Sequence, residues 1–262
     1  MIFPFTFAQI RLMMLAKSWF KDWFNSPYYH KLYFQRDEAE AALFIDKLID
    51  HLNPAAGCRM LDVACGKGRH SIQLASKGFE VTGIDLAEDS IREAKNYETD
   101  QLQFFLHDMR LPFWINYFDL AFNFFTSFGY FKTRREHDNG IRTIAQALKL
   151  NGHFIIDYLN VHYAEDHFVH QSNIAIDDVN YYITKWFDET HFYKKIVVED
   201  DNLKEPLEYI EQVNKFNLGD FTDMFAYQGL QIQEVYGDYS FNSYDLKHSP
   251  RLIIIAKKIK VE

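Results

Sequence analysis

Apolar residues recur along the first two thirds of the chain at spacings that alternate between helix and strand. From Glu38 to Leu52 they form a stripe at positions 41, 44, 45, 48, 49 and 52, which predicts an amphipathic helix that ends at Asn53-Pro54. The elements expected after it are a strand at 60–63, a helix at 71–77, a strand at 79–84, a helix at 88–97, strands at 102–106 and 118–122, a helix through 141–148, an Asn151-Gly152 turn and a strand at 153–158. Strands that alternate with helices are typical of a doubly wound parallel sheet.

The pattern changes between Val161 and Phe216. Tyr181, Ile183 and Lys185 alternate with Tyr182, Thr184 and Trp186, and further strand-length runs follow, separated by polar turns. This predicts an antiparallel β meander. A helix through 221–225 and strands at 230–236 and 252–258 come next. Because no helix joins these last two strands, we expect a hairpin and an antiparallel final strand.

The expected fold class is therefore α/β, a doubly wound, Rossmann-like, seven-stranded sheet with an antiparallel last strand and an inserted meander. Four regions follow from this interpretation: an N-terminal helical cap at 1–55, a core at 56–160, the meander at 161–216, and a helix with a β hairpin at 217–262 that completes the core. The meander is expected to cover the ligand edge of the sheet as a lid, and it could also mediate dimerisation.

Candidate chemistry is concentrated in the run from Leu61 to Ser71 and in the strand that ends at Asp85. A short strand leads into a turn with Gly66 and Gly68 and then into a helix. Glycines allow a ligand to approach the backbone closely, and a helix start offers unpaired N–H donors. A carboxylate that ends the next strand suits the paired hydroxyls of a ribose. The pattern predicts a site for a nucleoside with an anionic tail.

Two features favour a sulfonium cofactor over a dinucleotide. Ser71 stands where the G-x-G-x-x-G fingerprint has its third glycine. Asp62, just before the turn, would repel a pyrophosphate but would attract an α-ammonium group. Both features point to S-adenosylmethionine.

The string LDVACGKGRHS and its spacing to GID resemble the class I S-adenosylmethionine-dependent methyltransferases of the small-molecule type. The resemblance covers about residues 30–160 and, more loosely, the C-terminal strands. The sequence departs from the family at Ala64, where Gly is commoner, and at Ala87, where many relatives have a Ser that caps the next helix. That cap should then come from Asp85 or from water.

The resemblance implies a set of cofactor-binding residues at the carboxyl ends of the strands. Asp108 and Met109 would contact the adenine, Asn123 would lie beside the methionine portion, and an aromatic segment before the first long helix would close over the cofactor. The cofactor-binding candidates are Asp62, Ala64, Cys65, Gly66, Gly68, Asp85, Leu86, Asp108, Met109 and Asn123, with Tyr33 and Arg36 as weaker ones.

The methyl acceptor has no motif of its own. The acceptor would lose a proton, and four residues beside the sheet edge are candidates by location to take it: Tyr130, Asp157, Tyr158 and Asn160. Of these, the acceptor-site candidates are Tyr130, Tyr158 and Asn160. The segment 123–131 holds five aromatic residues, which predicts either core or the wall of a pocket that suits a sulfonium. Methyl transfer requires no metal, and Cys58 and Cys65 lack the spacing of a zinc site or a disulfide framework.

The composition and charge of the chain limit the classes of molecule that it is expected to bind. The chain of 262 residues carries a formal net charge of −9 without a basic tract, which argues against nucleic acid. The apolar run in residues 1–16 has no positive charge before it and no small-residue cleavage site after it, unlike a secretory signal, and it is too short to cross a membrane. Translation could instead begin at Met13 or Met14. We expect a cytoplasmic monomer or homodimer.

The predicted function is methyl transfer from S-adenosylmethionine to nitrogen or oxygen of a small molecule, with S-adenosylhomocysteine as product. The sequence leaves two alternatives open. One is a cofactor-binding pseudoenzyme that regulates a partner through the meander, and the other is an NAD-type oxidoreductase.

Overall fold

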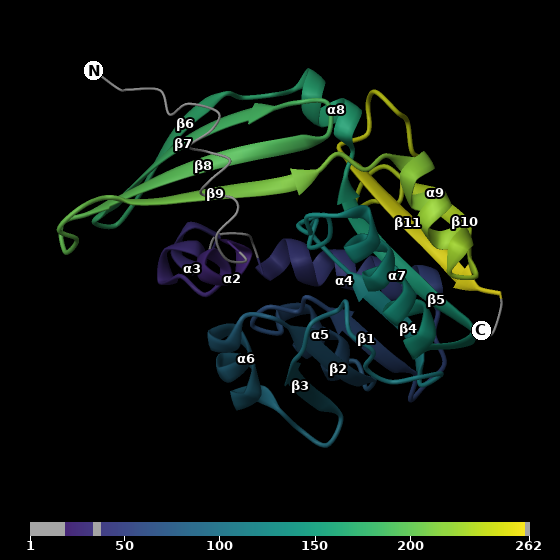
Figure 1. Ribbon diagram of the computed structural model, residues 1–262. Helices are drawn as coiled ribbons and strands as arrows, with labels where there is room; N and C mark the ends of the chain where they lie inside the picture. Colours follow the sequence, from purple (N-terminus) through teal and green to yellow (C-terminus); the bar gives the residue numbers. More distant parts are fainter. Residues whose placement is uncertain (1–18, 34–37, 260–262) are drawn as a thin grey trace.

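The computed structural model describes residues 19–33 and 38–259, which form two separate β-sheets with flanking helices (Figure 1). The larger sheet has seven strands in the order β10-β11-β5-β4-β1-β2-β3. Its strands are β1 (Arg59–Val63), β2 (Glu80–Asp85), β3 (Leu102–Leu106), β4 (Phe118–Asn123), β5 (Leu148–Leu159), β10 (Leu230–Tyr236) and β11 (Arg251–Lys258). The carboxyl ends of β1 to β4 therefore lie side by side at one edge.

The direction of the last strand confirms the predicted fold class. Strands β1 to β5 pair in parallel, whereas β11 pairs antiparallel with both β5 and β10. Because no crossover helix joins β10 to β11, β11 runs against β10, and its register shows that it also runs against β5.

Helices cover both faces of this sheet. The helices among the described residues are α2 (Trp19–Phe24), α3 (Pro27–Tyr33), α4 (Glu38–Leu52), α5 (Arg69–Ser76), α6 (Glu88–Ala94) with a 3₁₀ turn η1 (Lys95–Tyr97), α7 (Arg134–Ala147), α8 (Val161–Asp166) and α9 (Leu218–Tyr227). The apolar sides of α4, α5 and α6 pack in one core and those of α7 and α9 in another, on opposite faces of the sheet. Burial of these stripes is the main force that holds the layers together.

The smaller sheet is an antiparallel meander in the order β6-β7-β8-β9. Its strands are β6 (Gln171–Ile176), β7 (Val179–Phe187), β8 (His191–Asp200) and β9 (Leu207–Asn214). The predicted alternation is confirmed on β7, where Tyr181 and Ile183 are buried and Tyr182 and Thr184 are exposed. The region predicted as meander, 161–216, begins instead with a short helix, α8, which the sequence pattern does not predict.

Helices α2 and α3 lie beneath the four-stranded sheet (Figure 1). A third apolar core joins Trp23 and Leu32 of these helices to buried residues of β7 and β8, among them Tyr181 and Ile196. Polar contacts reinforce it: the Tyr28 hydroxyl donates to Asp200 at 3.1 Å, and Lys31 pairs with Asp177 at 3.0 Å. Segments about 150 residues apart in the sequence thus form one packed layer.

One local prediction differs from the structure. The Asn151-Gly152 turn lies inside β5 instead of before it, because the strand begins directly after α7 at Leu148. Phe118 pairs with Leu148 while Leu120 pairs with His153, so the strand bulges between these points, with Asn151 in the left-handed region.

In the described ranges, 19–33 and 38–259, no helix combines the length and apolar character needed to span a membrane.

Candidate functional site

Four loops meet at the carboxyl edge of β4, β1, β2 and β3. Because these strands are parallel neighbours, the structure brings the predicted cofactor residues together at this edge. The residues so gathered are Asp62, Ala64, Cys65, Gly66, Gly68, Asp85, Leu86, Asp108, Met109 and Asn123. Sequence positions more than 60 apart thereby become one candidate site.

The two glycines of the loop after β1 have different roles. Both have positive φ angles, +56° at Gly66 and +81° at Gly68. A Cβ on Gly66 would meet nothing within 4 Å, so this glycine borders open space. A Cβ on Gly68 would stand 2.4 Å from the Phe104 ring, so packing against β3 requires this glycine. Ala64 also has a positive φ, +62°, a conformation that an alanine adopts only at a cost.

The Asp85 carboxylate holds the loop and the next helix. One oxygen accepts the Gly66 N–H at 2.8 Å, and the other accepts the Ala87 N–H at 2.7 Å. The second contact is made to the N–H of Ala87, which is itself the N-cap residue of α6, and no side-chain cap hydrogen bond is formed there, so Asp85 does not supply the predicted helix cap. Burial raises the pKa of Asp85, although these N–H donors oppose the rise. Each oxygen keeps a further lone pair that ribose hydroxyls could use.

Two buried polar residues lie at the ends of β1 and β4. Asp62 is 1% exposed and accepts a 2.6 Å hydrogen bond from the Ser71 hydroxyl, and burial raises its pKa to about 6. The Asn123 amide donates to the Val63 carbonyl at 3.0 Å, while its Oδ1 atom is buried with no partner among the described residues. An unpaired buried acceptor is costly unless a ligand donor satisfies it. An ammonium group has that donor, so these residues fit the methionine end of S-adenosylmethionine.

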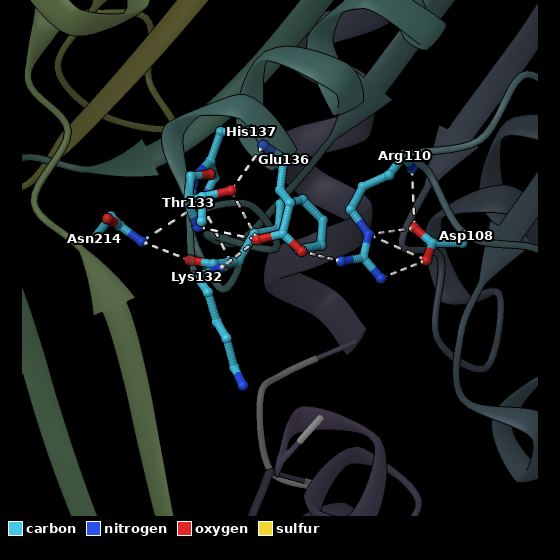
Figure 2. A network of polar contacts seen from close by, with 8 residues as sticks. Asp108, Arg110, Lys132, Thr133, Glu136, His137 and Asn214 are labelled. Atoms are coloured by element: carbon cyan, nitrogen blue, oxygen red, sulfur yellow. Dashed lines mark hydrogen bonds and ion pairs between the residues drawn. The ribbon is translucent and has the colours of Figure 1, made fainter. Parts of the chain in front are cut away.

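Asp108 belongs to a polar network that Figure 2 shows in full. The Arg110 guanidinium binds both Asp108 oxygens, the nearer at 2.6 Å, and its other nitrogen binds Glu136 at 2.7 Å. Burial raises the pKa of Asp108, but the hydrogen bonds from Arg110 more than offset this, so its net pKa lies below the ordinary value. Asp108 is therefore an ionised acceptor after β3, where the adenine contact is predicted.

The network continues from Glu136 to the four-stranded sheet (Figure 2). Thr133 and Glu136 form a capping box at the start of α7, a T-x-x-E signal that the sequence carries at 133–136 and that our prediction did not use. Thr133 also accepts from the His137 ring, whose pKa burial lowers to about 4. Asn214, the last residue of β9, donates to the carbonyls of Gly129 and Phe131. The cofactor edge and the end of the small sheet are thus fixed to the same helix start.

The aromatic segment after β4 supplies both core and site wall. Phe124 and Phe128 are buried, whereas Phe125 stacks on the His70 ring at 5.2 Å and Tyr130 lies half-buried against Phe24. Burial lowers the pKa of His70 to about 3, so this ring is neutral at neutral pH.

Asp157 holds the strained part of that segment. Phe125 and Thr126 have φ angles of +54° and +57°, and the Asp157 carboxylate accepts the Phe125 N–H at 2.8 Å. Arg251 of β11 pairs with the same carboxylate at 2.7 Å and donates to the Thr126 hydroxyl at 3.0 Å. No local sequence pattern indicates this ion pair, because its partners are 94 positions apart. Asp157, one of the four candidates beside the sheet edge, thus positions this loop through its hydrogen bonds.

Tyr158 and Asn160 have structural partners as well. Tyr158 is fully buried, and its hydroxyl donates to the Asn214 carbonyl at 2.6 Å. Asn160 is 1% exposed, caps α8 and donates to the carbonyls of Leu246 and Ser249. Their predicted acceptor contacts stay predictions, and of the three acceptor candidates Tyr130 alone is partly exposed.

The two weaker cofactor candidates lie before α4. The Tyr33 hydroxyl donates to Glu211 of β9 at 2.9 Å, so the structure places this residue against the four-stranded sheet. Arg36 lies outside the described residues. A cofactor contact by either residue stays a prediction.

The sheet order, the antiparallel β11, the glycine loop and the strand-end Asp85 together define the class I S-adenosylmethionine-dependent methyltransferases. Comparison with known proteins agrees. The family model described as a methyltransferase domain matches residues 54–211, which is more than half of the chain. The chain belongs to this family, and its cofactor is S-adenosylmethionine.

Individual relatives are more distant. YqeM of Bacillus subtilis, provisionally named a methyltransferase, is 37% identical over 114 residues, which cover 42% of this chain and 46% of YqeM. The match therefore spans about half the length of that relative. A methyltransferase structure from Clostridium acetobutylicum has a TM-score of 0.73 at 20% identity and covers 88% of this chain and 96% of its own. CalS10 of Micromonospora echinaspora is an amino pentose methyltransferase solved with bound S-adenosylmethionine. Its structure has a TM-score of 0.62 at 18% identity, and the match covers 98% of this chain and 99% of CalS10.

Proposed function

We propose that this protein transfers the methyl group of S-adenosylmethionine to nitrogen or oxygen of a small-molecule acceptor that binds under the four-stranded sheet. We further propose the division into regions 1–55, 56–160, 161–216 and 217–262, with the third region as a lid over the acceptor. Helices α2 and α3 and the four-stranded sheet would act together as a cap.

The observation that carries this proposal is a cavity of about 380 Å³ that is partly open to solvent, here called the cap pocket. It lies between α8, the inner face of the four-stranded sheet, and Tyr130 and Leu159 at the carboxyl edge of the large sheet. A cavity of this size holds a small metabolite and excludes a folded macromolecule. A larger cavity of about 640 Å³ lies beside Gly57 and Gly152, at the opposite edge of the sheet, away from the glycine loop.

The similarity to CalS10 supports a small acceptor, because a fold of this shape there serves an amino pentose methyltransferase. The aromatic lining by Tyr163, Phe168 and Phe192 supports it further, since such rings exclude water and pack against the body of a ligand. The free thiols of Cys58 and Cys65 fit a reducing compartment and support a cytoplasmic location.

Methyl transfer requires mainly that the methyl donor and the acceptor be aligned. When bound, S-adenosylmethionine supplies an activated methyl group on a sulfonium. The residues of this chain would do the rest: Asp85 and the Gly66 loop would hold the nucleoside, Asp62 and Asn123 the ammonium end, and the cap would keep water out. Tyr130 borders the cap pocket, which supports a role in which it would hold the nucleophile of the acceptor.

The test is calorimetry with S-adenosylmethionine, followed by detection of S-adenosylhomocysteine release with a pool of small metabolites. We expect Asp85→Ala to weaken cofactor binding by about 1.5–3 kcal/mol through the loss of charge-assisted hydrogen bonds. Asp223→Ala removes the same charge from the exposed side of α9 and should leave binding unchanged. Unchanged affinity in a folded Asp85→Ala variant would contradict the ribose assignment. Tight cofactor binding without turnover would favour the pseudoenzyme, and nicotinamide binding would favour an oxidoreductase.

A further inference from the structure

A row of three charged residues crosses the inner face of the four-stranded sheet. In the strand register, Lys185 of β7 stands directly opposite Lys194 of β8, and Lys194 stands directly opposite Glu211 of β9. Side chains of directly paired residues share one face of a sheet, with Cβ atoms about 4.5–5.5 Å apart. All three residues line the cap pocket. The row therefore presents two cations and one anion to whatever occupies it.

The one carboxylate of the row is already in use. Glu211 accepts the Trp23 indole N–H at 2.6 Å and the Tyr33 hydroxyl at 2.9 Å, and it pairs with Lys194 at 3.6 Å. Its side chain is 17% exposed, as is that of Lys194. Glu211 thus balances Lys194 and is held in place by two residues of α2 and α3.

The positive charge of Lys185 is not neutralised by a carboxylate in this way. It is half-buried, and among residues 19–33 and 38–259 no acidic side chain forms an ion pair with it. Like charges directly opposite each other on a sheet are unfavourable, and a half-buried ammonium without a counter-ion adds to that cost. The row carries one uncompensated positive charge in a chain whose formal net charge is −9. An anion in the cap pocket would remove both costs.

We propose that the methyl acceptor carries a phosphate or carboxylate group that binds Lys185, beside Lys194, while its apolar part packs on Phe168 and Phe192. This inference rests on the proposed function and adds the substrate class to it. The anionic group anchors the acceptor at the sheet, and its methyl-accepting atom faces the Tyr130 side of the pocket. Lys185 is accordingly a specificity-determining residue of the lid.

The test uses three small probes of similar shape: phenyl phosphate, phenylacetate and benzyl alcohol. Each is titrated calorimetrically into the full chain saturated with S-adenosylhomocysteine. We expect the two anions to bind at least about 10-fold more tightly than the neutral alcohol, because charge-assisted hydrogen bonds are the stronger ones. The tighter of the two anions indicates whether the natural acceptor carries phosphate or carboxylate. Binding of the anions should weaken as salt is raised.

Three variants locate the effect. Lys185→Gln should weaken the anions by about 10-fold or more with little change for benzyl alcohol, and Lys185→Arg should restore most of the affinity because it keeps the charge. Lys195→Gln is the matched control: it removes the same charge from the opposite face of β8, where Lys195 pairs with Glu208 at 2.8 Å. Thermal unfolding confirms that each variant is folded.

The inference is overturned if the three probes bind alike, if neither anion binds, or if Lys185→Gln and Lys195→Gln behave the same. Failure to bind S-adenosylhomocysteine would instead contradict the proposed function. The two failures are distinguishable because Lys185 lies on the small sheet, away from the glycine loop.

Discussion

At the residue scale, Asp62 shows how a binding group can lower the stability of the protein that carries it. Its carboxyl is buried, and its pKa is raised from 3.8 to about 6. Between these two pH values the folded state retains a proton that the unfolded state releases. The free energy of unfolding therefore falls as pH rises through this window, and it stays reduced above pH 6. An ammonium group bound beside Asp62 would reverse the effect.

We predict that Asp62→Asn stabilises the cofactor-free protein by about 1–3 kcal/mol at pH 7, because it removes a buried charge of similar shape. The gain should largely disappear near pH 4, where the folded-state carboxyl is protonated and the unfolded-state carboxyl is close to half protonated. The same variant should bind S-adenosylmethionine more weakly. Urea unfolding at pH 7 and pH 4, with and without the cofactor, measures these effects, and the exposed Asp223→Asn is the control. A gain that is equal at both pH values would contradict the burial argument.

At the element scale, the loop after β3 is tied to the start of α7 by a single side chain. Arg110 binds Asp108 in its own loop and Glu136 in the first turn of α7. These groups are between 16% and 31% exposed, so solvent screens them only in part. Since Glu136 also closes the capping box, the loop after β3 and the helix start should be lost or kept together.

We predict that Arg110→Ala lowers the free energy of unfolding by about 1–3 kcal/mol, because Asp108 and Glu136 lose their common counter-ion. Arg134→Ala breaks the exposed Arg134–Asp138 pair on the same helix and should change it by less than about 0.5 kcal/mol. Chemical denaturation compares the two, and calorimetry should show weaker cofactor binding for Arg110→Ala alone. Equal effects of the two variants would mean that the network adds nothing beyond a surface pair.

The elements also show how far sequence patterns reach. Helix α4 has the predicted bounds because its apolar residues follow one clear period, and strand β3 has them because it is a short apolar run between polar segments. Helix α8 was not predicted, since a helix of six residues holds too little periodic signal. The sequence predicts a turn before β5 where the structure has a bulge inside it, because Asn-Gly favours a left-handed residue in either setting. Local sequence signals therefore predict the backbone conformation of a residue better than they predict which element contains that residue.

At the scale of the whole molecule, the N-terminal helices connect the two sheets. Trp23 is fully buried, packs on Tyr209 of β9 with ring centroids 4.4 Å apart, and donates to Glu211. On the other side, the Asn25 side chain accepts the backbone N–H of Asp89 in α6, at 3.2 Å. The cap is thus built from the start and the middle of the chain and rests on the large sheet.

We predict that Trp23→Ala loosens α2, α3 and the four-stranded sheet together while the seven-stranded sheet stays intact. A buried Trp replaced by Ala loses about 3–5 kcal/mol of packing. Hydrogen exchange should rise in 19–33 and in β7 to β9 and stay unchanged in β1 to β5. The control is Trp186→Ala, which removes the Trp186 ring stacked on Tyr193 at 5.2 Å and should leave α2 and α3 protected. Uniform destabilisation of both sheets by Trp23→Ala would contradict a separable cap.

By itself, the sequence determined the fold class, the antiparallel last strand and the cofactor, because these depend on periodicity and on a short motif whose residues are neighbours in the chain. Only the tertiary structure decided which polar groups face one another: Asp157 with Arg251, Arg110 with Glu136, and Lys185 with Lys194. Those pairings depend on strand register and on the packing of elements far apart in the chain. A period of two assigns Lys185 to a face of its strand, but the charge opposite it is set by the neighbouring strand.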